Sequence, residues 1–335
     1  MKHRNLESAT QVLIYGLAVC FLLASGPLTA SSQEATGESV ASDLEPLPVE
    51  YLQVQGLRRA VRFYRPETLT DRPALVMLLH GSGGNGERFR RFTDGAFERQ
   101  ADKHGFIVAY PDALGGQWND CRTGALYHAA LSGIDDIRFL RAVVQRARVI
   151  AERDLGGVFA VGYSNGGHLL FRAALEHPEE FNGLAVIGAH LPVPQENSCK
   201  STQRPVSIFI VSGTDDPINP WAGGEIRIPG GGSPGHALSA EATAQYFREL
   251  AGTTGKPAIH HYADRNREDG VAIETQDWAA AGKSEVVLMV MHGGGHTLPY
   301  PTAKFPAEVV GPTSRDLDGA EVIWEFFQRQ LVGGE

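Results

Sequence analysis

Val158-Phe159-Ala160-Val161-Gly162-Tyr163-Ser164-Asn165-Gly166 is the stretch that decides the fold of this chain. Four apolar residues, which predict a buried strand, lead into a Gly-x-Ser-x-Gly turn, and a helix-forming segment follows at 169–176. A serine at the apex of such a turn has its hydroxyl pushed clear of the sheet. Both glycines are required, because a side chain at either position would collide with the neighbouring strand and helix. The stretch therefore predicts that Ser164 is a nucleophile.

A second match to the same pattern, Gly231-Gly232-Ser233-Pro234-Gly235, lacks this context. No apolar strand precedes it, and prolines flank a glycine run that is typical of an irregular loop. Ser164 is therefore the candidate nucleophile, and Ser233 is not.

Strands and helices alternate along the rest of the chain. We expect a hairpin over 51–64 and buried strands over 74–79, 106–110, 184–187, 206–211 and 286–291. Helices are expected over 87–104, 134–151, 241–250 and 316–331. This order predicts an α/β fold, with a mostly parallel twisted sheet and helices on both faces. Only the short stretch 190–205 separates two of the strands, so we expect no large lid over the site.

The amino terminus has the features of a secretory signal over residues 1–30, with a basic start, an apolar run over 12–24 and a small-residue cleavage site at Leu28-Thr29-Ala30. The apolar run is shorter than the roughly 20 residues that a membrane span needs, and an uncleaved anchor is the alternative. The polar, acidic stretch 31–49 predicts a disordered leader, and residues 50–335 predict one catalytic domain. We expect a secreted or periplasmic protein that does not bind membranes once the signal is removed.

Charge and cysteine content narrow the possible partners. The formal net charge is −9, so nothing in the electrostatics favours nucleic acid or an anionic membrane. Beyond the signal two cysteines remain, Cys121 and Cys199. An even pair in an exported protein predicts one disulfide, with two separate thiols as the alternative.

A serine hydroxyl needs a histidine base and an acid that orients the histidine, in the chain order serine, acid, histidine for this fold. The strand at 206–211 runs into Asp215 and Asp216, and adjacent residues point in different directions, so only one of them is the acid. The strand at 286–291 is followed by His292 and, after three glycines, by His296. The glycine loop favours His296, because it lets an imidazole swing over the sheet.

Two backbone N–H groups are expected to bind the oxyanion that forms during catalysis. One belongs to Asn165, and the glycine-rich loop 80–85 supplies the other, for which Ser82 is our choice. The loop does not fit a phosphate site, since it has neither a Gly-Lys-Ser/Thr ending nor a G-x-G-x-x-G spacing. The histidines show no H-E-x-x-H spacing and the cysteines lie far apart, so we expect no metal and no cofactor.

With these residues in place, the chain resembles the secreted esterases that include polyhydroxybutyrate depolymerases, feruloyl esterases and acetylxylan esterases. The resemblance is carried by Leu78–Gly84, Tyr110–Asp112, Trp118-Asn119, Asp135–Phe139, Gly162–Gly167, Gly213–Pro217 and Gly293–Thr297. It implies a Ser164–His296–Asp216 triad, because in that family the aspartate before the proline is the acid. Leu298 and Asn219-Pro220-Trp221 depart from the usual residues of the pocket rim, so the substrate stays open.

The expected activity is hydrolysis of carboxylic esters through an acyl-enzyme, with polyhydroxybutyrate depolymerase-like action first and feruloyl or acetylxylan esters as the alternative. An accessible site would suit polymer-attached esters. Trp118, Asn119 and Trp221 are candidates for substrate binding, and framework aromatics are the alternative for the two tryptophans. The loop 219–238 is expected to shape one wall of the pocket. A serine peptidase and a catalytically inactive binding protein on the same scaffold are the competing classes.

Overall fold

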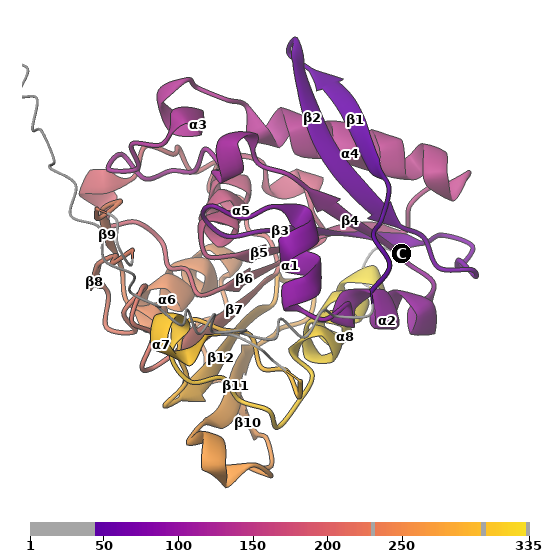
Figure 1. Ribbon diagram of the computed structural model, residues 1–335. Coiled ribbons are helices and arrows are strands. Elements are labelled where there is room, and N and C mark those ends of the chain that lie inside the picture. The colour runs from indigo at the N-terminus through magenta and orange to yellow at the C-terminus, as the bar shows by residue number, and fades with distance from the viewer. Residues whose placement is uncertain (1–43, 229–231, 303–305, 333–335) are drawn as a thin grey trace, which may run out of the picture. The chain divides into compact units, whose positions relative to one another are not determined.

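A ten-stranded sheet in the order β1-β2-β4-β3-β5-β6-β7-β12-β11-β10 organises the protein (Figure 1). The computed structural model describes residues 44–228, 232–302 and 306–332. The central strands pair in parallel from β4 to β12, and antiparallel strands flank them on both sides. The predicted α/β-hydrolase architecture is therefore confirmed.

The strands of the sheet are β1 Val49–Val54, β2 Leu57–Tyr64, β3 Ala74–Leu79, β4 Ile107–Pro111, β5 Gly157–Tyr163, β6 Gly183–Ile187, β7 Ile208–Gly213, β10 Ala258–His261, β11 Ala272–Trp278 and β12 Val286–His292. A separate two-stranded pair consists of β8 Gly224–Glu225 and β9 His236–Ala237. The helices are α1 Gly86–Phe92, α2 Ala96–His104, α3 His128–Leu131, α4 Asp136–Ala151, α5 Asn165–Glu176, α6 Ala240–Ala251, α7 Ala307–Val310 and α8 Gly319–Val332.

Each face of the sheet has its own hydrophobic core, because successive side chains of a strand point to opposite faces. In β3, Leu75, Met77 and Leu79 pack with helices α4, α5 and α6. The alternate residues of the same strand, among them Val76 and Leu78, pack with α1, α2 and α8. Both layers are buried, so the central strands read as continuous apolar runs and not as alternating patterns.

Two expected elements need correction, and two strands of the sheet were not expected. The helix predicted over 87–104 is two helices, α1 and α2, because Asp94 (φ 49°) and Gly95 (φ 66°) adopt left-handed backbone that ends the first one. The strand predicted over 206–211 is Ile208–Gly213. Strands β10 and β11 were not predicted; β10 is exposed along its length and carries little apolar signal.

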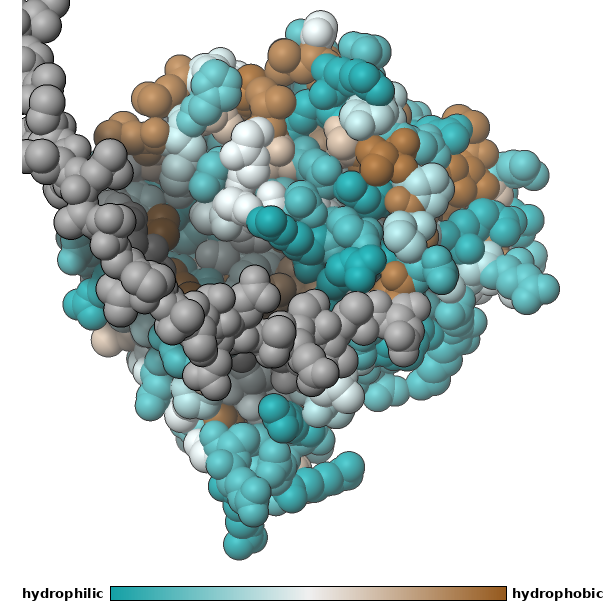
Figure 2. Space-filling model, viewed as in Figure 1, coloured by the Kyte–Doolittle hydropathy of each residue, from teal (hydrophilic) through white to brown (hydrophobic). Residues whose placement is uncertain are grey.

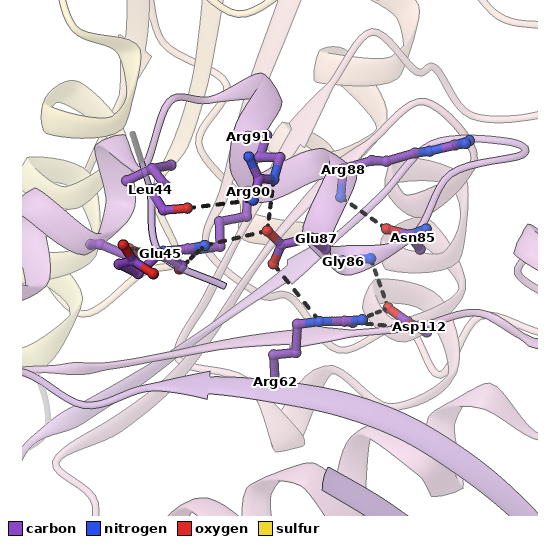
Figure 3. Close-up of polar contacts among 11 residues, drawn as sticks. Leu44, Glu45, Arg62, Asn85, Gly86, Glu87, Arg88, Arg90, Arg91 and Asp112 are labelled. Carbon is purple, nitrogen blue, oxygen red and sulfur yellow. Dashed lines mark hydrogen bonds and ion pairs between the residues drawn. The ribbon is translucent and has the colours of Figure 1, made fainter. Parts of the chain in front are cut away.

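Arginines of α1 bind the chain just before the first strand (Figure 3). Arg90 Nη1 donates to the Glu45 carbonyl at 2.8 Å, and Arg91 Nη2 donates to the Leu44 carbonyl at 3.4 Å. Leu47 packs against the core. The last part of the predicted leader 31–49 therefore has defined contacts, and β1 begins at Val49. The predicted signal at 1–30 and residues 31–43 lie outside the described residues.

The same helix is tied to the sheet through Asp112, which follows β4. Its Oδ1 accepts from the Gly86 N–H at 2.7 Å, and its carboxylate pairs with Arg62 of β2 at 3.1 Å (Figure 3). Asn85 caps α1 by accepting from the Arg88 N–H at 2.9 Å. These contacts fix the start of α1, directly after the glycine-rich loop that follows β3.

Cys121 and Cys199 form the predicted disulfide, across a sequence separation of 78 residues. It joins the loop before α3 to the connection between β6 and β7. That connection is short and forms no large lid, as expected. Within the described ranges, no helix has both the length and the apolar character needed to cross a membrane.

A buried ion pair joins β2 to the start of α4. Arg59 Nη2 contacts Asp136 Oδ1 at 2.7 Å, and both side chains are almost fully excluded from solvent. Asp136 Oδ2 also accepts from the Asn119 N–H at 2.7 Å, and the Arg59 guanidinium lies over the Phe139 ring at 4.0 Å. The Arg59–Asp136 ion pair therefore connects the β1–β2 hairpin, helix α4 and the loop that begins at Asn119.

We predict that Arg59→Met lowers the free energy of unfolding by about 3–5 kcal/mol, because it leaves the Asp136 carboxylate buried without its cation. Lys103→Ala is the matched control, since the Lys103–Glu321 pair is exposed and its loss should cost no more than about 1 kcal/mol. Urea unfolding of both variants measures the difference. Equal losses in the two variants would contradict this role of the Arg59–Asp136 pair.

Candidate active site

Ser164 stands at a strained turn between β5 and α5. Its φ of 54° and ψ of −116° are unusual for a residue with a side chain, at a typical cost of about 1–3 kcal/mol. The flanking glycines make the turn possible. A Cβ at Gly162 would lie 2.4 Å from the Gly166 carbonyl oxygen, and one at Gly166 would lie 2.3 Å from the Leu79 carbonyl oxygen. The collision expected from the sequence is thus present in the structure.

His296 is held by Asp216. The His296 Nδ1 lies 2.7 Å from Asp216 Oδ2, and both side chains are buried. Asp216 Oδ1 accepts from the N–H groups of Ile218 at 2.7 Å and Asn219 at 2.8 Å. These two N–H donors fix the carboxylate, which in turn orients the imidazole. His296 Nε2 has no hydrogen-bond partner among the described residues, and it lines the same pocket as Ser164.

The structure separates the two pairs of alternatives left by the sequence. Asp215 is exposed, and its Oδ1 accepts from the Thr214 hydroxyl at 3.0 Å. His292 ends β12 with an exposed side chain, 3.7 Å from Glu274. Asp216 and His296 are therefore the residues that the fold brings together. Their adjoining backbone also meets, since the Asp215 N–H donates to the Gly294 carbonyl at 2.9 Å.

The two predicted oxyanion donors lie on either side of the nucleophile. Asn165 is the first residue of α5, where a helix has no preceding carbonyl to accept its N–H groups. Ser82 is exposed in the loop after β3 and lines the pocket with Ser164. The side chain of Asn165 has a separate role, because it is buried and exchanges hydrogen bonds with the backbone of Trp118. The assignment of the N–H groups stays a prediction.

The pocket at Ser164 has a volume of about 240 Å³. Its lining combines polar and apolar side chains. The lining residues are Gly81, Ser82, Arg122, Tyr163, Ser164, Ile218, Asn219, Ile226, Ile228, His296 and Val309. Ile226 and Ile228 come from the loop 219–238 that the sequence predicted as a wall. Drug-sized ligand sites start at about 300 Å³, so this pocket suits a small or medium acyl group.

The structure does not bring the three predicted substrate-binding residues to this pocket. Trp118 is fully buried, and its Nε1 donates to the His80 carbonyl at 2.9 Å. Asn119 Nδ2 donates to the Ile134 carbonyl at 2.7 Å, and Trp221 packs partly buried against the core. Hydrogen bonds and packing thus account for all three as framework residues. The sequence shows only the type of each residue, and tryptophan is as common in protein cores as in binding sites.

Two lining residues were missed by the sequence reasoning. Tyr163 precedes the nucleophile and donates from its hydroxyl to the His296 carbonyl at 2.9 Å, so it links the elbow to the histidine loop. Arg122 follows Cys121 and pairs with Asp120 at 2.6 Å. The sequence feature that could have indicated Arg122 is its position next to Cys121, because the disulfide holds a charged residue at that position near the site.

Two buried histidines lie behind the catalytic pair. His190 is fully buried, its Nε2 contacts the Ser212 hydroxyl, and burial lowers its pKa to about 4. His168, one helical turn after Ser164, is also buried, and burial lowers its pKa well below the ordinary histidine value. Neither ring is charged near neutral pH, so neither repels a proton that His296 takes up.

One group of possible metal ligands occurs among the described residues, at His177, Glu179 and Glu180. Arg141 Nε already donates to both Glu180 oxygens at 2.9 Å, and its Nη2 contacts His177 Nδ1 at 3.2 Å. An arginine that occupies these acceptors accounts for the cluster as an exposed ion-pair network.

Comparison with known proteins identifies the fold. Residues 74–207 match the family described as "alpha/beta hydrolase fold". The structure also resembles an acetyl xylan esterase from Aspergillus awamori, with a TM-score of 0.55 and 16% identity over 84% of this chain and 99% of that one. The protein is thus an α/β hydrolase in fold, with a serine, a histidine and an aspartate at the expected strand ends.

Two proteins that are similar in sequence carry names that include the word esterase. The protein named "Putative esterase NocK", of Nocardia uniformis subsp. tsuyamanensis, is 29% identical over 84% of this chain and 81% of its own length. A bifunctional acetylxylan esterase/xylanase of Neocallimastix patriciarum is 25% identical over 50% of this chain. The match spans only 23% of the length of that second relative.

We predict that Gly188→Ala lowers kcat/KM for 4-nitrophenyl acetate by about 100-fold, because displacement of a catalytic group by about 1 Å can cost that much. Gly188 has a φ of +59°, and a Cβ there would lie 2.6 Å from His296 Nδ1. Gly183→Ala, at the start of the strand that ends just before Gly188, is the control, since its Cβ would meet only ordinary contacts at 3.4 Å or more. The melting temperature of each variant shows that it is folded. Wild-type activity of a folded Gly188→Ala enzyme would refute the steric explanation.

We also predict that acid destabilises the fold through His190. The pKa of an unfolded histidine is near 6.5 and that of His190 in the folded chain is about 4. Between these values the unfolded chain binds a proton that the folded chain does not, so the free energy of unfolding falls as the pH falls, by up to about 3 kcal/mol for this residue. Urea unfolding at pH 7, 5.5 and 4.5 should show the decline, and His190→Gln should make it shallower. An unchanged pH slope in His190→Gln would show that another group causes the decline.

Proposed function

We propose that this protein is a serine esterase that hydrolyses carboxylic esters through an acyl-enzyme. The observation that carries the proposal is the contact between His296 and Asp216 at 2.7 Å, in a pocket that Ser164 also lines. The match to a protein named as an esterase over most of both chains supports the same reaction class. An inactive scaffold would need none of the three residues, which makes the binding-protein alternative the weaker one.

In the first half of the reaction, the Ser164 hydroxyl attacks the ester carbonyl carbon while His296 Nε2 takes its proton. Asp216 stabilises the imidazolium that forms, and its own carboxylate is fixed by two backbone N–H donors. The N–H groups of Ser82 and Asn165 bind the developing oxyanion. The protonated His296 then donates its proton to the alcohol oxygen, which leaves, and Ser164 carries the acyl group.

In the second half, water enters the pocket and His296 takes one of its protons. The resulting hydroxide attacks the acyl carbonyl, and Ser164 leaves with the proton held by His296. The products are a carboxylic acid and the regenerated enzyme. Since every step uses side chains and backbone groups of the chain itself, the proposal needs no cofactor.

For the acyl group, the sequence predicted polyhydroxybutyrate depolymerase-like action, with feruloyl or acetylxylan esters as the alternative. The name of the acetylxylan esterase/xylanase relative supports the alternative over half of this chain. The pocket volume of about 240 Å³ suits any of these acyl groups, which are all small or medium in size. Secretion of the mature protein after the predicted signal at 1–30 is part of the proposal, and the basic start and apolar run of that segment support it.

We predict that Ser164→Ala lowers kcat for 4-nitrophenyl acetate by at least about 10⁴-fold, the typical loss when a triad nucleophile is removed. A fluorophosphonate should label the wild-type protein and not this variant. Ser233→Ala is the matched control, because Ser233 occupies the second Gly-x-Ser-x-Gly pattern and its hydroxyl forms hydrogen bonds with the Gly235 backbone. Labelling that survives Ser164→Ala would place the nucleophile elsewhere, and no labelling of the wild type would favour the inactive scaffold.

Three esters then separate the substrate classes: acetylated xylan, methyl ferulate and soluble 3-hydroxybutyrate oligomers. The alternative, action on acetylxylan or feruloyl esters, predicts Ser164-dependent release from one of the first two at a higher kcat/KM than from the oligomers. Faster cleavage of the oligomers would instead support polyester degradation.

A further inference from the structure

Arg122 is a buried cation on the wall of the active-site pocket. Its side chain is only 3% exposed, yet it lines the same pocket as Ser164 and His296. A guanidinium in this position is costly unless its donors are satisfied, so the partner of each nitrogen is informative.

Asp120 satisfies one edge of the guanidinium. Arg122 Nε donates to Asp120 Oδ1 at 3.0 Å, and Nη2 donates to Asp120 Oδ2 at 2.6 Å. Nη2 also donates to the Tyr127 hydroxyl at 2.6 Å. These bonds fix the plane of the guanidinium and neutralise its charge locally.

The third nitrogen, Nη1, has no hydrogen-bond partner among the described residues. It is also not one of the buried polar atoms that lack a partner, so it retains accessible surface. Arg122 lines the pocket of Ser164, and Nη1 is its one guanidinium nitrogen without a partner among the described residues, so we assign that surface to the pocket. On this assignment a fixed N–H donor is available to a ligand.

The backbone around Arg122 is equally constrained. Cys121 is bonded covalently to Cys199, and the Arg122 N–H donates to Asp120 Oδ1 at 2.8 Å. Arg122 also forms a β-bridge with Asn197. Such a rigid donor loses little entropy when it binds a ligand, which is what a specificity-determining residue requires.

The contacts of Arg122 place it on the oxyanion side of the pocket. Its partner Asp120 accepts from Asn165 Nδ2 at 2.8 Å, and its partner Tyr127 adjoins the Ser82 side chain. The leaving alcohol must instead lie near His296, which gives it a proton. Because the partners of Arg122 contact the predicted oxyanion residues, we assign its donor to the acyl part of the substrate and not to the alcohol.

The charges around Arg122 determine which kind of hydrogen-bond acceptor its Nη1 binds. Asp120 already neutralises Arg122, and Asp216 adds a second carboxylate close to the pocket. A carboxylate on the substrate would therefore gain little from Arg122 and would be repelled by Asp216. An uncharged oxygen, in a hydroxyl, ether or carbonyl group, accepts a hydrogen bond from Nη1 without that penalty.

We propose that Arg122 is a specificity-determining residue that donates from Nη1 to an uncharged oxygen on the acyl group. This inference rests on the proposed esterase function, and it names the substrates as esters of oxygen-substituted acids. Plain alkanoyl groups of the same size leave the donor unpaired and are cleaved less efficiently.

The test compares esters that differ only by an oxygen in place of a methylene. 4-Nitrophenyl 3-methoxypropanoate is matched to 4-nitrophenyl pentanoate, and methyl 4-methoxycinnamate is matched to methyl 4-ethylcinnamate for an oxygen further along the acyl group. The measured quantity is the ratio of kcat/KM within each pair, in the wild type and in Arg122→Lys. Lysine still pairs with Asp120 but lacks the second donor arm.

We expect the oxygen preference of at least one pair to fall by about ten- to hundredfold in Arg122→Lys, the range for one hydrogen bond to a charged group. General damage to the site lowers both esters of a pair alike and leaves the ratio unchanged. Arg141→Lys is the control, because it makes the same change at an arginine that pairs with Glu180 and does not line the pocket, so its ratios should equal those of the wild type.

Each outcome is decisive for the proposal. Unchanged ratios in Arg122→Lys for both pairs, with activity retained, would overturn the role of Arg122 and leave the esterase function intact. No Ser164-dependent hydrolysis of any ester would overturn the proposed function itself. An Arg122-dependent preference for mono-4-nitrophenyl adipate over 4-nitrophenyl hexanoate would show that the acceptor is a carboxylate and would refute the uncharged oxygen.

Discussion

The close approach of α5 to strand β3 is the constraint on which the rest of the site depends. The Gly166 Cα lies so near the Leu79 carbonyl that no side chain fits between them, and Gly162 meets the Gly166 carbonyl in the same way. This contact forces Ser164 into its strained backbone conformation. The strain is stable because β5 is buried between two parallel neighbours, and the Ser164 N–H donates to the Ile187 carbonyl at 2.8 Å.

One edge of the sheet explains why the three candidate catalytic residues lie close together. Parallel strands bring their carboxyl ends to one side, so residues that follow β5, β7 and β12 converge although they are far apart in sequence. Asp216 and His296 contact across 80 positions for this reason. The sequence pattern was sufficient to predict this, because buried strands and glycine turns leave strong local signals and the chain order is fixed by the fold.

Features that depend on packing between distant segments could not be predicted from local sequence patterns. The break between α1 and α2 follows from left-handed backbone at Asp94, a residue that does not demand it. Trp118 was placed in the pocket by its type, whereas the structure buries it under the loop after β3. Arg122 was missed because its sequence context is that of an ordinary surface residue. The neighbouring disulfide and the ion pair with Asp120 hold it in the lining of the pocket.

The polarity of the pocket is consequently built from two sources with different origins. Its apolar residues include Ile226 and Ile228, from the loop after β7. Its polar residue Arg122 is connected to Asn165, a predicted oxyanion donor, because Asp120 bonds both side chains. Under the proposed mechanism, the apolar residues select acyl groups by size and Arg122 selects them by their oxygen atoms. A change at Asp120 would then affect the oxyanion site and the acyl site together, whereas a change at Ile226 or Ile228 would affect the acyl site.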